Sequence, residues 1–168
     1  MPRILIADDL GLYRKGLRAS LEAALPDLEV SEAHCLDQAL MFLEVGDRFD
    51  VVLLDLYMPG VVSFDSLRAA RDCYANIRFM VISASDSRRD LIGCLSAGLH
   101  GFVSKFQTDL EIVDAIQQVL NGAIYVPPWL ARIDPLGGVR LESDDLTIET
   151  PLEKLTPRQR DVLPLLAK

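Results

Sequence analysis

Several side chains that can bind metals or phosphoryl groups stand where strand-like segments of the sequence end. Two aspartates, Asp8 and Asp9, follow the first apolar segment, and Asp55 ends the third. Ser83 ends the fourth such segment and Lys105 the fifth. Each residue has an ordinary explanation by itself, such as Asp9 capping the helix that follows. However, no requirement of a packed core explains why three carboxylates, a hydroxyl and an ammonium all stand at strand ends.

The chemistry that this set could support is magnesium binding and phosphoryl transfer. Carboxylates that lie within a few ångströms repel one another and resist ionisation unless a cation joins them. Oxygen ligands of this kind suit Mg²⁺, which retains several waters and binds phosphate oxygens. The metal would hold a phosphoryl group against one carboxylate acting as nucleophile. The Ser83 hydroxyl and the Lys105 ammonium would contact the other phosphoryl oxygens.

The elements that must position these groups alternate between strand and helix patterns over the first 124 residues. Apolar or alternating runs predict strands at 3–8, 28–33, 49–55, 77–83 and 100–105. Helical periodicity predicts helices at 10–25, 36–46, 64–74, 86–97 and 108–122, the last opened by a capping box of Thr108 and Glu111. Strict alternation predicts a doubly wound α/β fold, with a five-stranded parallel sheet and helices on both of its faces. The carboxyl ends of parallel strands share one edge, where ligands bind in such folds.

Composition excludes several classes of protein. The 168 residues carry a net charge of −8, which repels a nucleic-acid backbone. No apolar run approaches the roughly 20 residues of a membrane span, and the N-terminus has no export signal. The three cysteines form no Cys-x-x-Cys pair, which argues against a zinc site and a disulfide framework. We therefore expect a cytoplasmic protein that does not engage a membrane.

Residues 1–124 resemble the receiver domain of two-component response regulators. The similar segments are "ADD" after the first strand, "LLDLYMPG" around Asp55, "ISASD" after the fourth strand and "FVSK" in the fifth. The resemblance implies the strand order 2-1-3-4-5 and makes Asp55 the phosphoacceptor. It also implies Mg²⁺ bound directly by Asp9, Asp55 and the backbone carbonyl of Tyr57, with Asp8 acting mostly through water.

The same resemblance implies a switch. Ser83 would be the switch hydroxyl, drawn inward by the phosphoryl group, and Lys105 the ammonium that contacts that group. Phe102 matches the aromatic switch position of the family, although packing against the fourth helix would explain it equally well. The space that Ser83 vacates would let Phe102 move inward, and this movement would change the surface of the fourth helix, fifth strand and fifth helix. Tyr57 could also overhang the phosphoryl site and slow self-dephosphorylation.

The end of the chain resembles a different module. Residues 125–150 read as a linker, because prolines, a glycine pair and an acidic cluster interrupt any periodicity. Residues 151–168, with "LTPRQRDVLPLLAK", are similar to the first helix of a LuxR-type helix-turn-helix domain. The recognition helix of such a domain would lie beyond Lys168, so we expect no specific DNA binding by these 168 residues.

The resemblance therefore implies a transcriptional response regulator. Its receiver would be phosphorylated by a histidine kinase and would form a homodimer on phosphorylation, with DNA bound only through the missing output domain. It would not be an enzyme, beyond autophosphorylation from phosphodonors and slow self-dephosphorylation. One alternative is a phosphorylation-independent receiver that acts as an interaction module. A remote alternative is an aspartyl-nucleophile phosphohydrolase, but those enzymes carry Asp-x-Asp after the first strand, where this chain has "ADDLG".

Overall fold

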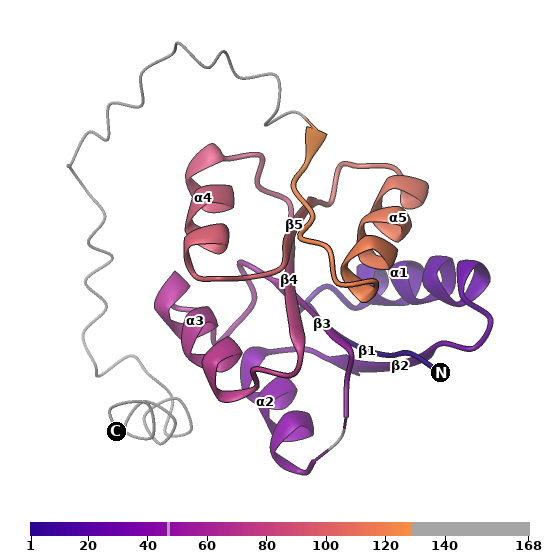
Figure 1. Ribbon diagram of the computed structural model, residues 1–168, viewed down its shortest axis with the longest axis horizontal. Coiled ribbons are helices and arrows are strands. Elements are labelled where there is room, and N and C mark those ends of the chain that lie inside the picture. The colour runs from indigo at the N-terminus through magenta and orange to yellow at the C-terminus, as the bar shows by residue number, and fades with distance from the viewer. Residues whose placement is uncertain (47, 129–168) are drawn as a thin grey trace.

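The computed structural model describes residues 1–46 and 48–128, which form a three-layered α/β domain (Figure 1). Five parallel strands make one sheet in the order β2-β1-β3-β4-β5, which confirms the predicted fold and strand order. The strands are β1 (Arg3–Ala7), β2 (Glu29–Ala33), β3 (Val51–Asp55), β4 (Arg78–Ser83) and β5 (Gly101–Ser104). The helices are α1 (Gly11–Ala24), α2 (Leu36–Glu44), α3 (Phe64–Cys73), α4 (Arg88–Ser96) and α5 (Asp109–Leu120). Helices α2, α3 and α4 cover one face of the sheet, and α1 and α5 cover the other.

Successive residues of each strand point alternately into two apolar cores. In β1, Leu5 and Ala7 belong to the core beneath α2, α3 and α4. Ile4 and Ile6 belong to the core beneath α1 and α5. The inner strands are buried on both faces, which explains why their sequences are continuous apolar runs rather than alternating ones. This two-residue alternation also decides on which face each side chain at the carboxyl edge lies.

The start of α1 differs from the simplest reading of the sequence. The N-cap residue is Leu10, which makes no side-chain capping hydrogen bond, so Asp9 does not cap this helix. Instead Oδ1 of Asp8 accepts a hydrogen bond of 2.8 Å from the backbone N–H of Leu10. A guanidinium nitrogen of Arg14 donates to the backbone oxygen of Asp8 from one turn into the helix. The first aspartate therefore shapes this turn, and Asp9 is left free of a capping role.

Helix α4 begins at Arg88, two residues after the predicted start. The connection before it is held by serine hydroxyls: Ser83 accepts from the N–H of Ser85, and Ser85 accepts from the N–H of Ser87. The carboxylate of Asp86 accepts a 2.6 Å hydrogen bond from the hydroxyl of Ser104 in β5. Such local bonds compete with helix formation, and they keep residues 84–87 outside the helix. The predicted capping box at the start of α5 is confirmed.

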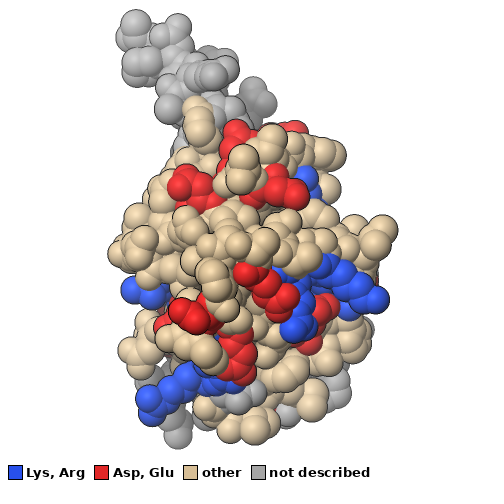
Figure 2. Space-filling model, turned by 90° about the vertical axis from the view of Figure 1, so that its right-hand side faces the viewer, with Lys and Arg blue, Asp and Glu red and all other residues tan. Residues whose placement is uncertain are grey.

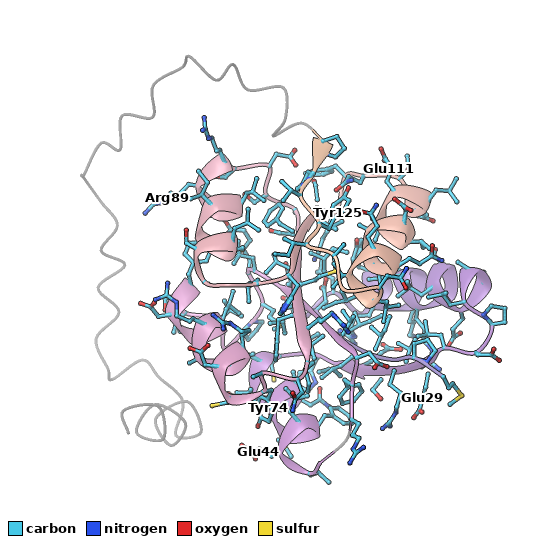
Figure 3. The ribbon with its side chains drawn as sticks, viewed as in Figure 1. Glu29, Glu44, Tyr74, Arg89, Glu111 and Tyr125 are labelled. Atoms are coloured by element: carbon cyan, nitrogen blue, oxygen red, sulfur yellow. The ribbon has the colours of Figure 1, made fainter. Side chains whose placement is uncertain are left out.

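The chain returns to the sheet after α5. Tyr125 is buried beside β5, between this strand and α5 (Figure 3). Its N–H donates to the carbonyl of His100, and its carbonyl accepts from the N–H of Phe102. The side-chain amide of Gln107 donates to its hydroxyl at 3.0 Å. Only residues 125–128 of the predicted linker are described here; the rest of it and the predicted C-terminal helix lie outside the described residues. Within the part of the chain that the structure covers, none of the helices is both long and apolar enough to cross a bilayer.

Candidate functional site

Three carboxylates meet at the carboxyl edge of the sheet. Asp8 and Asp55 are buried, with 0% and 5% of their surfaces exposed, whereas Asp9 is exposed. One carboxylate oxygen from each of the three lies within 4.8 Å of the others. The site is therefore an acidic pocket with one solvent-facing ligand, and it could bind a metal ion.

Strand register explains why two of these carboxylates lie side by side. Ala7 of β1 is paired with Leu54 of β3, so the next residues along the two strands, Asp8 and Asp55, are also neighbours. Both residues continue the alternation that sends Ile6 toward α1 and α5. Two buried like charges at this spacing repel each other, so the site needs a counter-charge.

Lys105 supplies that counter-charge. Its position after β5 continues the alternation of Val103, so it lies on the same face as the two buried aspartates. Its Nζ lies 2.6 Å from Oδ2 of Asp8 and 3.3 Å from Oδ2 of Asp55. The lysine side chain is itself only 8% exposed, so the ion pairs lie away from solvent. Oδ2 of Asp8 is buried and accepts no hydrogen bond from any described residue, so its ion pair with Lys105 is what compensates its burial.

The electrostatics of Asp55 differ from those of a surface aspartate. Burial raises its pKa, and the carboxylate of Asp8 raises it further. The ammonium of Lys105 and the backbone N–H of Tyr57, which donates to Asp55, act in the opposite direction but do not cancel the rise. The carboxyl group of Asp55 therefore ionises less readily than its contacts with Lys105 and Tyr57 alone would predict. A divalent cation would favour the ionised form that a nucleophile or metal ligand requires.

Tyr13 of α1 is a part of the site that sequence reasoning did not identify. The Nζ of Lys105 lies 4.7 Å from the centroid of its ring, in a cation–π arrangement. Its hydroxyl is buried and has no hydrogen-bond partner among the described residues. Burial and the carboxylates of Asp8, Asp109 and Asp55 raise the pKa of Tyr13 well above its ordinary value. The only sequence signal was helical spacing, which places residue 13 one turn after Asp9.

Ser83 lies at the same edge of the sheet, Phe102 lies within β5 opposite Val81, and both side chains are on the other face. Ser83 follows the alternation of Phe79 and Val81, whose side chains enter the core beneath α4. Its hydroxyl is fully buried and accepts a 3.1 Å hydrogen bond from the N–H of Ser85. Phe102 is also fully buried, in the same core as Leu91 of α4. The packing alternative for Phe102 is therefore present in the structure, and the inward position of its ring is already occupied.

The side chain of Tyr57 reaches α4. It is 65% exposed, and its hydroxyl donates a 2.6 Å hydrogen bond to Oδ2 of Asp90. The hydroxyl of Ser85 donates to the same carboxylate oxygen. The residue two positions after Asp55 is thus tied to both the β4–α4 connection and the first turn of α4.

The face formed by α1 and α5 carries charges of both signs. Figure 2 shows this side of the molecule, which lies to the right in Figure 1. Acidic and basic side chains are interspersed on it, and the basic ones form no continuous field. Such a surface lacks the concentrated positive charge that holds a nucleic-acid backbone.

Comparison with curated proteins finds similarity along the whole chain. The chain is 33% identical over 169 residues to the glycerol metabolism activator of Pseudomonas putida, covering 100% of this chain and 76% of that protein. It is 31% identical over 166 residues to the nitrate/nitrite response regulator protein NarL of Escherichia coli K12, covering 98% of this chain and 74% of that protein.

Comparison with solved structures and family models points to one family. A LuxR family DNA-binding response regulator from Silicibacter pomeroyi superposes with a TM-score of 0.68 at 28% identity, over 76% of this chain and 98% of that one. A CheY-like receiver domain protein from Methanospirillum hungatei JF-1 has the same fold, with a TM-score of 0.65 at 21% identity over 72% of this chain and 98% of that one. The model of the response regulator receiver domain matches residues 4–117. The chain therefore belongs to the response regulator family, and the strands and helices of its described residues form the receiver domain of that family.

Proposed function

We propose that Asp55 accepts a phosphoryl group from a phosphohistidine of a histidine kinase, in a reaction that requires Mg²⁺. The observation that carries this proposal is the buried pairing of Asp55 with Asp8 and Lys105, next to the exposed carboxylate of Asp9. Carboxylates in an apolar sheet edge destabilise the fold unless they are compensated. Their presence together is therefore better explained by a reaction than by structure alone.

The residues of the acidic pocket fit a magnesium ion. All three side chains offer oxygen ligands, which Mg²⁺ prefers, and the exposure of Asp9 leaves room for bound water and a phosphoryl oxygen. Asp9, Asp55 and the backbone carbonyl of Tyr57 would hold the ion directly, and Asp8 mostly through water. When bound, Mg²⁺ would neutralise negative charge on the pocket and on the incoming phosphoryl group.

The chain's own groups then have defined tasks in the transfer. An ionised oxygen of Asp55 attacks phosphorus, and the bond between phosphorus and the imidazole nitrogen of the kinase histidine breaks. The electron pair of that bond leaves with the imidazole. The ammonium of Lys105, 3.3 Å from Asp55 before the reaction, would move to a phosphoryl oxygen and stabilise the developing charge. The product is an acyl phosphate on β3.

The switch would start at Ser83. Its hydroxyl is held by the N–H of Ser85, so a new hydrogen bond to the phosphoryl group requires the β4–α4 connection to rearrange. That connection is tied to β5 through Asp86 and Ser104 and to α4 through Ser85 and Asp90. Since Phe102 is already buried, the connection and α4 are the parts that would move. The surface formed by α4, β5 and α5 would change as a result.

This switch would control transcription through a DNA-binding output domain. The relatives include a protein described as a LuxR family DNA-binding response regulator, and residues 151–168 resemble the first helix of a LuxR-type domain. The receiver's acidic net charge makes a separate output domain the DNA-binding part. Phosphorylation would favour a homodimer, which light scattering of the phosphorylated and unphosphorylated chain would measure.

The central experiment is phosphorylation by a small donor. The chain is incubated with acetyl phosphate and Mg²⁺, and its intact mass is measured. We expect a gain of one phosphoryl group, which disappears when EDTA removes the metal and in the variant Asp55→Asn. Asp27→Asn, which changes an exposed aspartate between α1 and β2 at the opposite edge of the sheet, is the matched control and should react normally. No gain by the unaltered chain, or an equal gain by Asp55→Asn, would overturn the proposal.

A further inference from the structure

The ammonium of Lys105 contacts two kinds of partner. It forms ion pairs with the carboxylates of Asp8 and Asp55, at 2.6 and 3.3 Å. It also lies over the ring of Tyr13, whose centroid is 4.7 Å from Nζ. Because the lysine side chain is 8% exposed, water competes weakly for the ammonium, and a cation–π contact is stronger in such surroundings.

The Tyr13 side chain is fixed by packing rather than by its hydroxyl. The ring packs against the apolar core beneath α1 and α5, which includes Ile82 and Val103. The hydroxyl is buried without a hydrogen-bond partner in the described part of the chain. A tyrosine phenol is neutral at pH 7 because its ordinary pKa is about 10, and burial raises that pKa further. The feature that faces Lys105 is therefore an uncharged aromatic ring in a fixed position.

We propose that Tyr13 is a positioning residue for phosphoryl transfer, and that its ring holds the ammonium of Lys105 at the sheet edge when the metal and the phosphoryl group occupy the carboxylates. This inference rests on the proposed function of Asp55. It adds a residue of α1 to the machinery that binds the phosphoryl group.

The need for such a residue follows from competition at the pocket. A bound divalent cation would neutralise much of the negative charge on Asp8 and Asp55. The two carboxylates would then attract the ammonium of Lys105 less strongly. Lysine has a flexible stem and a strongly hydrated ammonium, which would then turn toward solvent. An aromatic face attracts the ammonium but has no formal charge, so it does not compete with the carboxylates for the metal and repels a phosphoryl group far less than a further carboxylate would. Tyr13 thus keeps Lys105 in reach of the phosphoryl oxygens during the step that needs it.

Three variants of the full chain separate this role from simple packing. Tyr13→Leu removes the ring, and Tyr13→Phe removes only the hydroxyl. Leu17→Ala, one turn further along α1, weakens the same core but keeps the ring of Tyr13, and it is the control for general destabilisation. Phosphorylation by acetyl phosphate is followed by intact mass, and beryllofluoride and Mg²⁺ affinities are measured by titration at a temperature where all variants are folded.

We expect Tyr13→Leu to be phosphorylated roughly 3- to 30-fold more slowly and to bind beryllofluoride more weakly by a similar factor, the range expected for a lost cation–π contact. Its Mg²⁺ affinity should be unchanged or higher, because a loosened Lys105 competes less for the carboxylates. Tyr13→Phe and Leu17→Ala should react within about twofold of the unaltered chain, because both keep the aromatic ring at residue 13.

Specific results would overturn the inference. A normal rate in Tyr13→Leu would show that the ring does not position Lys105. An equal loss in Tyr13→Phe would assign the effect to the hydroxyl, and an equal loss in Leu17→Ala would assign it to packing. If the unaltered chain is phosphorylated on Asp55, any of these results refutes only the positioning role of Tyr13, and the proposed function of Asp55 stands. If the unaltered chain is not phosphorylated at all, the proposed function and this inference fail together.

Discussion

Replacing Lys105 by methionine removes the ammonium from the sheet edge and keeps most of the apolar stem. The change leaves Asp8, with none of its surface exposed, and Asp55, with 5% exposed, as neighbouring carboxylates without their cation. We expect Lys105→Met to lower the free energy of unfolding at neutral pH and to make that free energy strongly dependent on Mg²⁺.

The magnitude follows from the burial of the ion pairs. Removing one partner of a buried pair costs about 3–5 kcal/mol, a large part of the about 5–15 kcal/mol that stabilises a typical domain. Protonation of Asp55 reduces this cost, because its pKa is already raised and rises further without the ammonium. Mg²⁺ that binds only the folded state would restore about 2.7 kcal/mol at 100 times its Kd. We therefore expect a loss of about 2–4 kcal/mol without the metal and recovery of most of it with the metal.

The dependence on pH has a definite sign. A carboxylate whose folded pKa lies above its unfolded value of about 4 binds more protons in the folded state than in the unfolded state over the interval between the two values. The stability of Lys105→Met should therefore fall as pH rises from about 4 through the folded pKa of Asp55. Below about pH 4 the carboxyl group of Asp55 is mostly neutral, so the difference from the unaltered chain should shrink.

Urea unfolding followed by circular dichroism measures these effects at several pH values, with and without MgCl₂. Lys15→Met, which removes the same charge from an exposed position of α1, is the matched control. If Lys105→Met and Lys15→Met unfold at the same urea concentration at neutral pH, the ammonium is not compensating the buried carboxylates. The electrostatic account of the site would then be wrong.

Three further predictions concern the elements around the site. In Gly93→Ala, the new Cβ would lie 2.5 Å from ring carbons of Phe64, and we expect this overpacking to lower the free energy of unfolding by about 1–3 kcal/mol. In a Phe64→Ala background the same change should instead raise that free energy, and urea unfolding measures both effects. Thr108→Ala removes the capping box that Glu111 completes; it should cost about 1 kcal/mol and speed amide exchange in the first turn of α5, while exchange in α2 stays unchanged. Tyr57→Asn removes the ring that is anchored to α4; we expect a shorter lifetime of the acyl phosphate, and an unchanged lifetime would show that the ring does not exclude water.

The fold could be predicted from the sequence because each element carries its own local signal. The apolar runs are strand-sized, and Gly46 and Gly122 follow two of the helices with positive φ values of 89° and 91°. Alternation of strands and helices then requires a parallel sheet. The strand order 2-1-3-4-5 came from the family resemblance, because periodicity is a property of each segment and contains no information on which strands are neighbours.

The acidic pocket could be predicted for a related reason, but the contact between Tyr13 and Lys105 could not. Strand ends are visible in the sequence, and parallel strands bring their carboxyl ends to one edge. The sequence therefore predicts that Asp8 and Asp55 lie close together, as they do in the structure. The contact between Tyr13 and Lys105 joins α1 to the end of β5 across 92 positions of sequence. It depends on the rotation of α1 about its axis and on how α1 packs beside α5, and neither is encoded in the pattern of one segment.

Ser83 shows what a strand-end argument omits. A strand end fixes the edge on which a side chain lies, but the parity of its position fixes the face. Asp55 is paired in register with Ile82, so Ser83 lies one residue further along and on the opposite side of the sheet. Its hydroxyl therefore bonds within the β4–α4 connection in this structure, rather than within the acidic pocket. For Ser83 to reach a phosphoryl group on Asp55, the backbone of this connection must move as well as the side chain. A residue out of phase with the carboxylates is thus suited to couple chemistry on the α1 and α5 face to the position of α4 on the other.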